Sequence, residues 1–127
     1  MDIMATLAKN ILSVNFDDLP SEAVEAAKRA IIDNLGVTIA GSSAKGCQLL
    51  VKYLKEWGGP SESTIAVFGG KAPSSLAAQA NGAMARAMEI DDVSDTFPLH
   101  PCMAIVPACL AIAGAGSITL TPSPTIS

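Results

Sequence analysis

The segment Glu89–Asp95 carries four carboxylates within seven residues, and the single histidine of the chain, His100, follows five residues later. An imidazole has an ordinary pKa of about 6.5, so it exchanges protons readily at neutral pH. Glu89, Asp91 and Asp92 could hold a substrate beside that imidazole or tune its basicity. The segment therefore indicates a proton-transfer site. The simpler interpretation is a solvated loop whose aspartates cap neighbouring helices.

The run Asp91–Asp95 reads Asp-Asp-Val-Ser-Asp and also matches the DDxxD pattern of isoprenoid synthases. In those enzymes, aspartates one turn apart on a helix bridge Mg²⁺ ions to a diphosphate, because hard cations prefer carboxylate oxygens. A terpenoid pocket is usually rich in aromatic side chains, whereas this chain has one Trp, one Tyr and three Phe. The pattern leaves a magnesium-diphosphate enzyme as a secondary hypothesis.

The cysteines and glycines indicate no second site. Cys47, Cys102 and Cys109 lack the spacing of metal ligands, and three cysteines do not make a disulfide framework. Cys102 and Cys109 are seven residues apart, so we expect them on one helix face as small buried apolar residues. The segment Gly69–Lys71 lacks the upstream glycine of a phosphate-binding loop. No metal site is predicted.

Apolar residues recur at helical spacing in five segments, so the sequence predicts a nearly all-α fold, a helical bundle. The 74–88 segment consists mainly of small residues, which let helices approach closely, so we expect it to be the central helix. Gly36 costs about 1 kcal/mol relative to alanine inside a helix, so we expect it to permit close packing. Pro107 should kink the last helix or fall in its first turns. The expected helices cover residues 3–14, 20–41, 49–57, 74–88 and 103–113, with a brief strand or extended connector at 63–68.

Charge is unevenly distributed along the chain. The net charge of −4 and the scattered Lys and Arg residues argue against a nucleic-acid partner. From Thr96 to Ser127 there are 32 residues without a charged side chain. The most apolar part, 102–116, is shorter than the roughly 20 residues of a membrane-spanning helix, so we expect a buried helix and no membrane partner. The N-terminus shows no secretory signal, so we expect a cytoplasmic location.

Three blocks of the sequence resemble the N-terminal region of the MmgE/PrpD family. Their order and spacing are those of the family, and together they cover roughly residues 5 to 114. The blocks are Leu19-Pro20-Ser21-Glu22 with Ala26-Ala27-Lys28-Arg29, Ile32-Asp33-Asn34-Leu35-Gly36-Val37 and Ala40-Gly41; residues 77–92, which read AAQANGAMARAMEIDD; and His100-Pro101 with Ile105-Val106-Pro107-Ala108 and Leu110-Ala111-Ile112-Ala113.

The family includes 2-methylcitrate dehydratase, cis-aconitate decarboxylase and an iminodisuccinate epimerase. The resemblance implies a large all-helical domain, a smaller α/β lid domain, a homo-oligomer that is usually a dimer, and no metal or organic cofactor. It also implies proton abstraction next to a carboxylate of a small polycarboxylate substrate, with loss of water or CO₂ or with reprotonation. His100 would be the general acid or base. Glu89, Asp91 and Asp92 would position the substrate, order the loop or assist protonation.

The acidic loop departs from the family pattern at two positions. The family usually has Asp-aromatic-Asp-Asp-Thr before the His-Pro pair. Glu89 stands at the first Asp, and Val93 replaces the Thr, whose hydroxyl Ser94 or Thr96 could supply. These departures suggest a subgroup whose substrate is unassigned.

The resemblance ends near Gly114, so we divide the chain into a partial family domain, 1–114, and an unaligned tail, 115–127. Family members are several times longer and supply their basic substrate-binding residues later in the chain. A frameshifted reading frame, a truncated reading frame or a deliberately shortened chain would each explain the difference. The leading hypothesis is an N-terminal fragment of a lyase or isomerase that is inactive alone. The alternative is a non-catalytic helical module that associates with another chain. We expect self-association in either case, because the helices 74–88 and 103–113 would expose apolar faces.

Overall fold

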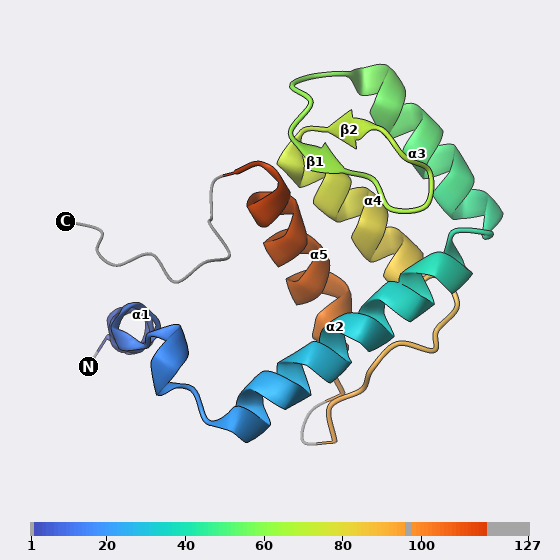
Figure 1. Cartoon of the computed structure of the whole chain (residues 1–127). Helices are drawn as coiled ribbons and strands as arrows, with labels where there is room; N and C mark the ends of the chain where they lie inside the picture. Colours follow the sequence, from blue (N-terminus) through green and yellow to red (C-terminus); the bar gives the residue numbers. More distant parts are fainter. Residues whose placement is uncertain (1, 96–97, 117–127) are drawn as a thin grey trace.

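The computed structural model describes residues 2–95 and 98–116, and these form a mostly helical fold, as expected (Figure 1). Four of the five expected helices have bounds within about two residues of the prediction, and the third begins four residues earlier than expected. The elements are α1 (Ile3–Ser13), a 3₁₀ turn (Phe16–Asp18), α2 (Ser21–Gly41), α3 (Lys45–Trp57), β1 (Ser63–Thr64), β2 (Lys71–Ala72), α4 (Ser74–Arg86) and α5 (Cys102–Gly114).

The expected extended segment at 63–68 forms a strand only over its first two residues. Ser63 pairs with Ala72 and Thr64 with Lys71, in an antiparallel ladder. The segment then turns, and Val67 adopts a left-handed φ of 65°. β1 and β2 have two residues each and form a two-stranded sheet that packs against α4 and α5.

The helix α4 lies at the centre of the fold, as its small residues predict, and packs against α2, α3, α5 and both strands. Ala77, Ala80, Met84 and Ala85 are buried on it. Gly41, at the end of α2, lies so close to α4 that an added Cβ would collide with the carbonyl of Met84. The expectation for Gly36 is wrong. A Cβ there would meet nothing within 4 Å, because this glycine lies on the exposed side of α2.

Pro107 lies inside α5. A proline has no N–H, so it leaves the carbonyl of Met103, four residues earlier, without its helical donor. Gly82 of α4 lies beside this carbonyl, and a Cβ at Gly82 would be 2.9 Å from the oxygen. A glycine on one helix and a proline on the other thus meet where α4 and α5 pack together.

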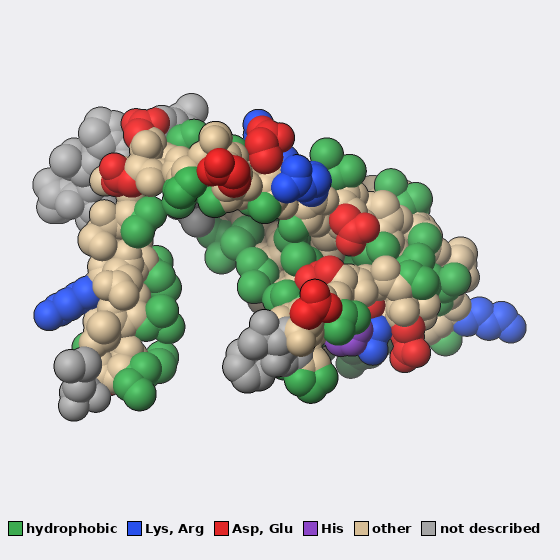
Figure 2. All heavy atoms as spheres, turned by 90° about the horizontal axis from the view of Figure 1, so that it is seen from below, with side chains coloured by type: hydrophobic (Ala, Val, Ile, Leu, Met, Phe, Trp, Pro, Cys, Tyr) green, Lys and Arg blue, Asp and Glu red, His purple; other side chains and the backbone are tan. Residues whose placement is uncertain are grey.

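The exposed surface is unusually apolar. No residue of α1 is buried, and α1 stands away from the other helices (Figures 1 and 2). Cys109 is exposed on α5, so the expectation that it would be buried is wrong, while Cys102 is half-buried. Among the described residues, no helix combines the length and apolarity that crossing a bilayer requires.

Candidate functional site

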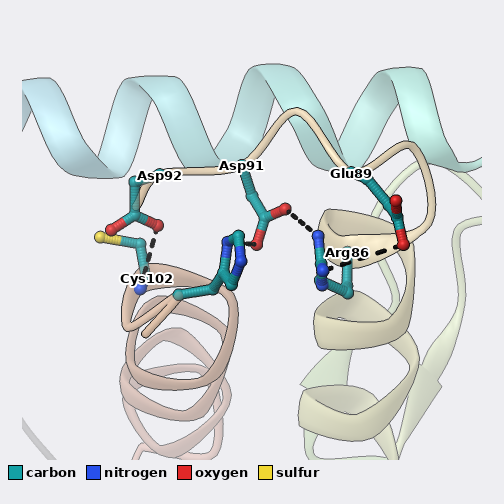
Figure 3. Close-up of polar contacts among 6 residues, drawn as sticks. Arg86, Glu89, Asp91, Asp92 and Cys102 are labelled. Carbon is teal, nitrogen blue, oxygen red and sulfur yellow. Dashed lines mark hydrogen bonds and ion pairs between the residues drawn. The ribbon is translucent and has the colours of Figure 1, made fainter. Parts of the chain in front are cut away.

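The acidic loop joins the C-terminus of α4 to the N-terminus of α5 and crosses beside α2 (Figure 3). Arg86 is the last residue of α4, and His100 lies two residues before α5 begins. The loop therefore inherits its position from two packed helix ends. Its residues 96 and 97 lie outside the described part of the chain, so the possible role of the Thr96 hydroxyl is not tested.

Asp91 lies between Arg86 and His100 and connects them. Its side chain is only 1% exposed, and Arg86 Nη1 donates a hydrogen bond of 2.9 Å to Asp91 Oδ1. The other oxygen, Oδ2, lies 3.3 Å from His100 Nδ1, a distance within range of an ion pair, although the angles are not those of a hydrogen bond. A buried carboxylate is costly without a cation or donors, and Arg86 provides both.

The His100 side chain is partly exposed, but its Nδ1 is buried. Nδ1 is buried against Asp91, while the side chain as a whole is 29% exposed. The exposed fraction therefore falls on the other atoms of the side chain, and Nε2 is the ring nitrogen among them. A carboxylate facing Nδ1 favours the tautomer with a proton on Nδ1 and a free lone pair on Nε2. Such an imidazole is oriented to accept a proton from a molecule outside the loop.

Asp92 faces away from this pair, toward α5. Its Oδ1 accepts a hydrogen bond of 3.2 Å from the backbone N–H of Cys102, the first residue of α5 (Figure 3). Carboxylates are stabilising at this end of a helix, where N–H groups have no partner within the helix. Asp92 therefore anchors the loop to α5, as the capping interpretation of the sequence proposed.

The thiol of Cys102 is in an environment that keeps it protonated. Burial raises its pKa to about 11, and the hydrogen bond and negative charge of Asp92, followed by the charge of Asp33, act in the same direction. A thiol with this pKa is a poor nucleophile at neutral pH, because the thiolate is the reactive form. The site therefore has no activated cysteine at this position.

Glu89 lies at the exposed edge of the loop. It adopts a left-handed φ of 54°, which is uncommon for residues other than glycine. Its carboxylate is 3.8 Å from Arg86 Nη2 and mostly exposed to solvent, so the interaction with Arg86 is weak. Glu89 is thus the predicted site residue that is most free to contact a ligand.

The structure brings the four predicted site residues to one loop but gives them different surroundings. His100 and Asp91 face one another, Asp92 holds α5, and Glu89 lies at the edge. The sequence analysis missed Arg86, which compensates Asp91. Arg86 is the only charged residue between Ser74 and Met88, and that isolation beside an acidic loop was the available signal.

The arrangement that the DDxxD hypothesis needs is not present in the described loop. Residues 91–95 are not helical, Asp91 is buried beside Arg86, and Asp92 binds the end of α5. Across residues 2–95 and 98–116, no cluster of three or more His, Cys, Asp or Glu side chains is placed to hold a metal ion.

Ser94, whose hydroxyl could replace that of the family threonine, donates its backbone N–H to the Leu99 carbonyl at 2.9 Å.

The fold and the loop define a helical domain that presents a histidine backed by a carboxylate. The model of the MmgE/PrpD N-terminal domain matches residues 5–119, and the chain belongs to this family. The match extends past Gly114, where the resemblance was expected to end; residues after 116 lie outside the described structure, and the proposed division at 114 stays a prediction.

Two curated fungal proteins illustrate the relationship. A protein named cis-aconitate decarboxylase from Aspergillus terreus is 30% identical over 95 residues, which are 75% of this chain and 19% of that protein. A cis-aconitate decarboxylase-like protein, oryM, from Aspergillus oryzae is 22% identical over 112 residues, which are 88% of this chain and 23% of that protein. The chain therefore spans about a fifth of the length of these relatives.

Proposed function

We propose that this chain contributes the histidine-bearing part of a lyase or isomerase that acts on a small polycarboxylate. The reaction is proton transfer at a carbon next to a carboxylate, with loss of CO₂ or water or with epimerisation. The observation that carries the proposal is the contact between His100 Nδ1 and the buried Asp91. Membership of the family and the two relatives named for cis-aconitate decarboxylase support it.

In this proposal, His100 takes or returns the proton through Nε2. Asp91 is a positioning residue that fixes the ring and its tautomer, and the hydrogen bond from Arg86 holds Asp91 in place. Asp92 acts through α5, because it holds the helix that follows His100. Glu89, at the exposed edge, contacts the substrate or a proton donor.

The charges around the loop do not suit a polyanion without further cations. Asp33, Glu89, Asp91 and Asp92 lie on or beside the loop, and Arg86 is already bound to Asp91. A substrate with two or three carboxylates would be repelled unless cationic groups beyond this loop bind it. We therefore expect no measurable turnover by the isolated chain.

The experiment joins two measurements on the isolated chain and one on a chimera. Long-range ¹H–¹⁵N spectra of the chain should show His100 with its proton on Nδ1, and Asp91→Asn should remove that preference. Decarboxylation and dehydration are followed by NMR with cis-aconitate, citrate and 2-methylcitrate. A chimera then carries residues 5–119 in place of the matching segment of the Aspergillus terreus relative.

The chimera should turn over one of these acids, and His100→Gln should reduce its rate at least a hundredfold. Asp95→Asn, which changes an exposed carboxylate of the same loop, is the matched control and should leave the rate within about twofold. A folded chimera that is equally active with His100→Gln would refute the proposal. Turnover by the isolated chain, abolished by His100→Ala, would refute only the expectation that it is inactive alone.

A second candidate function is a non-catalytic module that associates with another chain. The observation that favours it is the large number of exposed apolar side chains on α1, α2 and α5, including Ile3, Ile32 and Ile105. A folded chimera that shows no turnover, together with stable self-association of the chain, would favour this alternative.

A further inference from the structure

The two members of the Asp91–His100 pair are held by different helices. The carboxylate of Asp91 accepts a hydrogen bond of 2.9 Å from Arg86, which is the last residue of α4. His100 lies two residues before the start of α5. The distance of 3.3 Å between Asp91 Oδ2 and His100 Nδ1 therefore spans the gap between two helix ends.

The loop alone does not fix this distance, because it is bound to both helices. Asp92 accepts a hydrogen bond of 3.2 Å from the backbone N–H of Cys102, so the loop backbone follows α5. The neighbouring carboxylate of Asp91 points instead to Arg86, on α4 (Figure 3). A change in the separation of the two helices must therefore stretch either the hydrogen bond from Arg86 or the contact with His100.

Close to this end, α4 and α5 pack together through Gly82 and the backbone carbonyl of Met103. Gly82 is four residues before Arg86, and Met103 is three residues after His100. A Cβ at Gly82 would be 2.9 Å from the Met103 oxygen, which is closer than real Cβ atoms come. Because this oxygen belongs to the backbone, a side chain at Gly82 can be accommodated only if one helix moves.

We propose, on the basis of the acid or base role proposed for His100, that Gly82 is a positioning residue for the pair. The absence of a side chain there lets α5 lie close enough to α4 for the imidazole to reach the carboxylate that Arg86 holds. An alanine Cβ would have to move from 2.9 Å to at least 3.4 Å, where ordinary van der Waals contact begins, so the helices would separate by about 0.5 Å. A shift of this size lengthens the contact between Asp91 and His100 from 3.3 Å to about 3.8 Å.

The first test measures the two tautomers of His100 in long-range ¹H–¹⁵N spectra of the full chain. His100 is the single histidine, so its signals need no assignment against others. The wild type should carry its proton mainly on Nδ1. Gly82→Ala should lower the ratio of the Nδ1–H to the Nε2–H tautomer by about twofold to threefold, because the interaction with the carboxylate falls with distance.

Two control variants separate this effect from a general change in stability. Gly36→Ala adds the same methyl group to α2, where it meets nothing within 4 Å, and should leave the ratio unchanged. Gly59→Ala is strained, because Gly59 has a left-handed φ of 121° and a Cβ there would be 2.6 Å from Pro73, at the opposite end of α4 from the site. It should lower the free energy of unfolding in urea without changing the tautomer ratio.

The background Asp91→Asn shows whether Gly82 acts through the carboxylate. This substitution removes the tautomer preference, so Gly82→Ala should have no further effect when the two are combined. A folded Gly82→Ala variant with the wild-type ratio would overturn the proposal. An equal change in either control, or an undiminished effect in the Asp91→Asn background, would also overturn it.

The second test uses turnover by the chimera that carries residues 5–119. Gly82→Ala should lower its kcat about tenfold and leave KM within about twofold, because a misplacement of about 1 Å can cost a hundredfold in rate. This measurement decides the question if the short Gly82→Ala chain does not fold, and an unchanged kcat would then overturn the proposal. A chimera without any turnover would refute the proposed function instead, and the tautomer ratio of the chain would still test the role of Gly82.

Discussion

The Arg86–Asp91 contact allows a quantitative test of how the loop is held. We consider Arg86→Met, which keeps the length and apolar stem of the side chain and removes its charge. In the variant, Asp91 remains 1% exposed and loses the hydrogen bond of 2.9 Å from the guanidinium. Only His100, 3.3 Å away through Nδ1, remains beside the carboxylate.

The expected cost follows from these surroundings. Removing one partner of a fully buried ion pair costs about 3–5 kcal/mol, because the other charge is left uncompensated. Arg86 is 36% exposed, so water screens part of the interaction and the cost falls below this range. We expect Arg86→Met to lower the free energy of unfolding by about 2–3 kcal/mol. Asp91→Asn should cost about 1–2 kcal/mol, because an amide is cheaper to bury than an unpaired carboxylate.

A double-mutant cycle measured by urea denaturation separates the pair from its surroundings. The double variant Arg86→Met/Asp91→Asn should lose less free energy of unfolding than the two single variants lose together. The difference, which is the coupling energy of the pair, should be about 1–2 kcal/mol. Lys52→Met is the control, since Lys52 pairs with Glu56 at 3.9 Å on an exposed surface and should cost less than about 0.5 kcal/mol. If the single losses add within about 0.3 kcal/mol, or if Arg86→Met costs no more than the control, Asp91 is not held in the way described.

Three further predictions concern other parts of the fold. Gly41→Ala should lower the free energy of unfolding by about 2–3 kcal/mol in urea, because its methyl group would collide with the α4 backbone, whereas Gly36→Ala should raise it by about 0.5–1 kcal/mol. At pH 8, iodoacetamide should alkylate Cys102 roughly a hundredfold more slowly than an ordinary cysteine, since burial raises its pKa from 9.0 to about 11, and peptide mapping should find the label on Cys109 instead. Hydrogen bonds from the first residue of α4 lower the pKa of Glu62 in the folded state, so its carboxylate stabilises the fold above the unfolded pKa near 4.5, and this contribution is lost as the pH falls through the lower folded value. Glu62→Gln should therefore be less stable than the wild type at pH 7 and closer to it at pH 3 in the same urea assay; equal differences at both pH values would contradict this assignment.

The helices could be predicted from the sequence because their signals are local. Apolar spacing located five helices, and the alanine-rich run from residue 74 correctly indicated the central one. The two glycines of α2 could not be separated in the same way. Gly36 and Gly41 look alike in sequence, yet only Gly41 faces α4 at contact distance. Which glycine is required depends on how α2 is rotated against α4, and this is set by the packing of several helices together.

The candidate site was predicted as a set of residues but not as an arrangement. The spacing of Glu89, Asp91, Asp92 and His100 marked the loop, but it could not show which carboxylate faces the imidazole. Asp91 and Asp92 are neighbours in sequence, and their side chains point to different helix ends. The sequence gives Arg86 only a weak signal, because a single arginine near a helix C-terminus ordinarily has a role in helix stability alone.

The helical class, the family and the loop on which the ionisable residues gather can be read from the sequence alone, because periodicity, composition and motif order are properties of the chain read residue by residue. The three-dimensional packing shows that Asp91 is the carboxylate beside His100, that Arg86 compensates it, and that Asp92 caps α5. It also leaves α1 without a single buried residue in the described chain. The partners of Asp91 and Asp92 depend on where the ends of α4 and α5 meet, and the exposure of α1 depends on which helix faces pack together. Both are consequences of packing between segments that are distant in sequence.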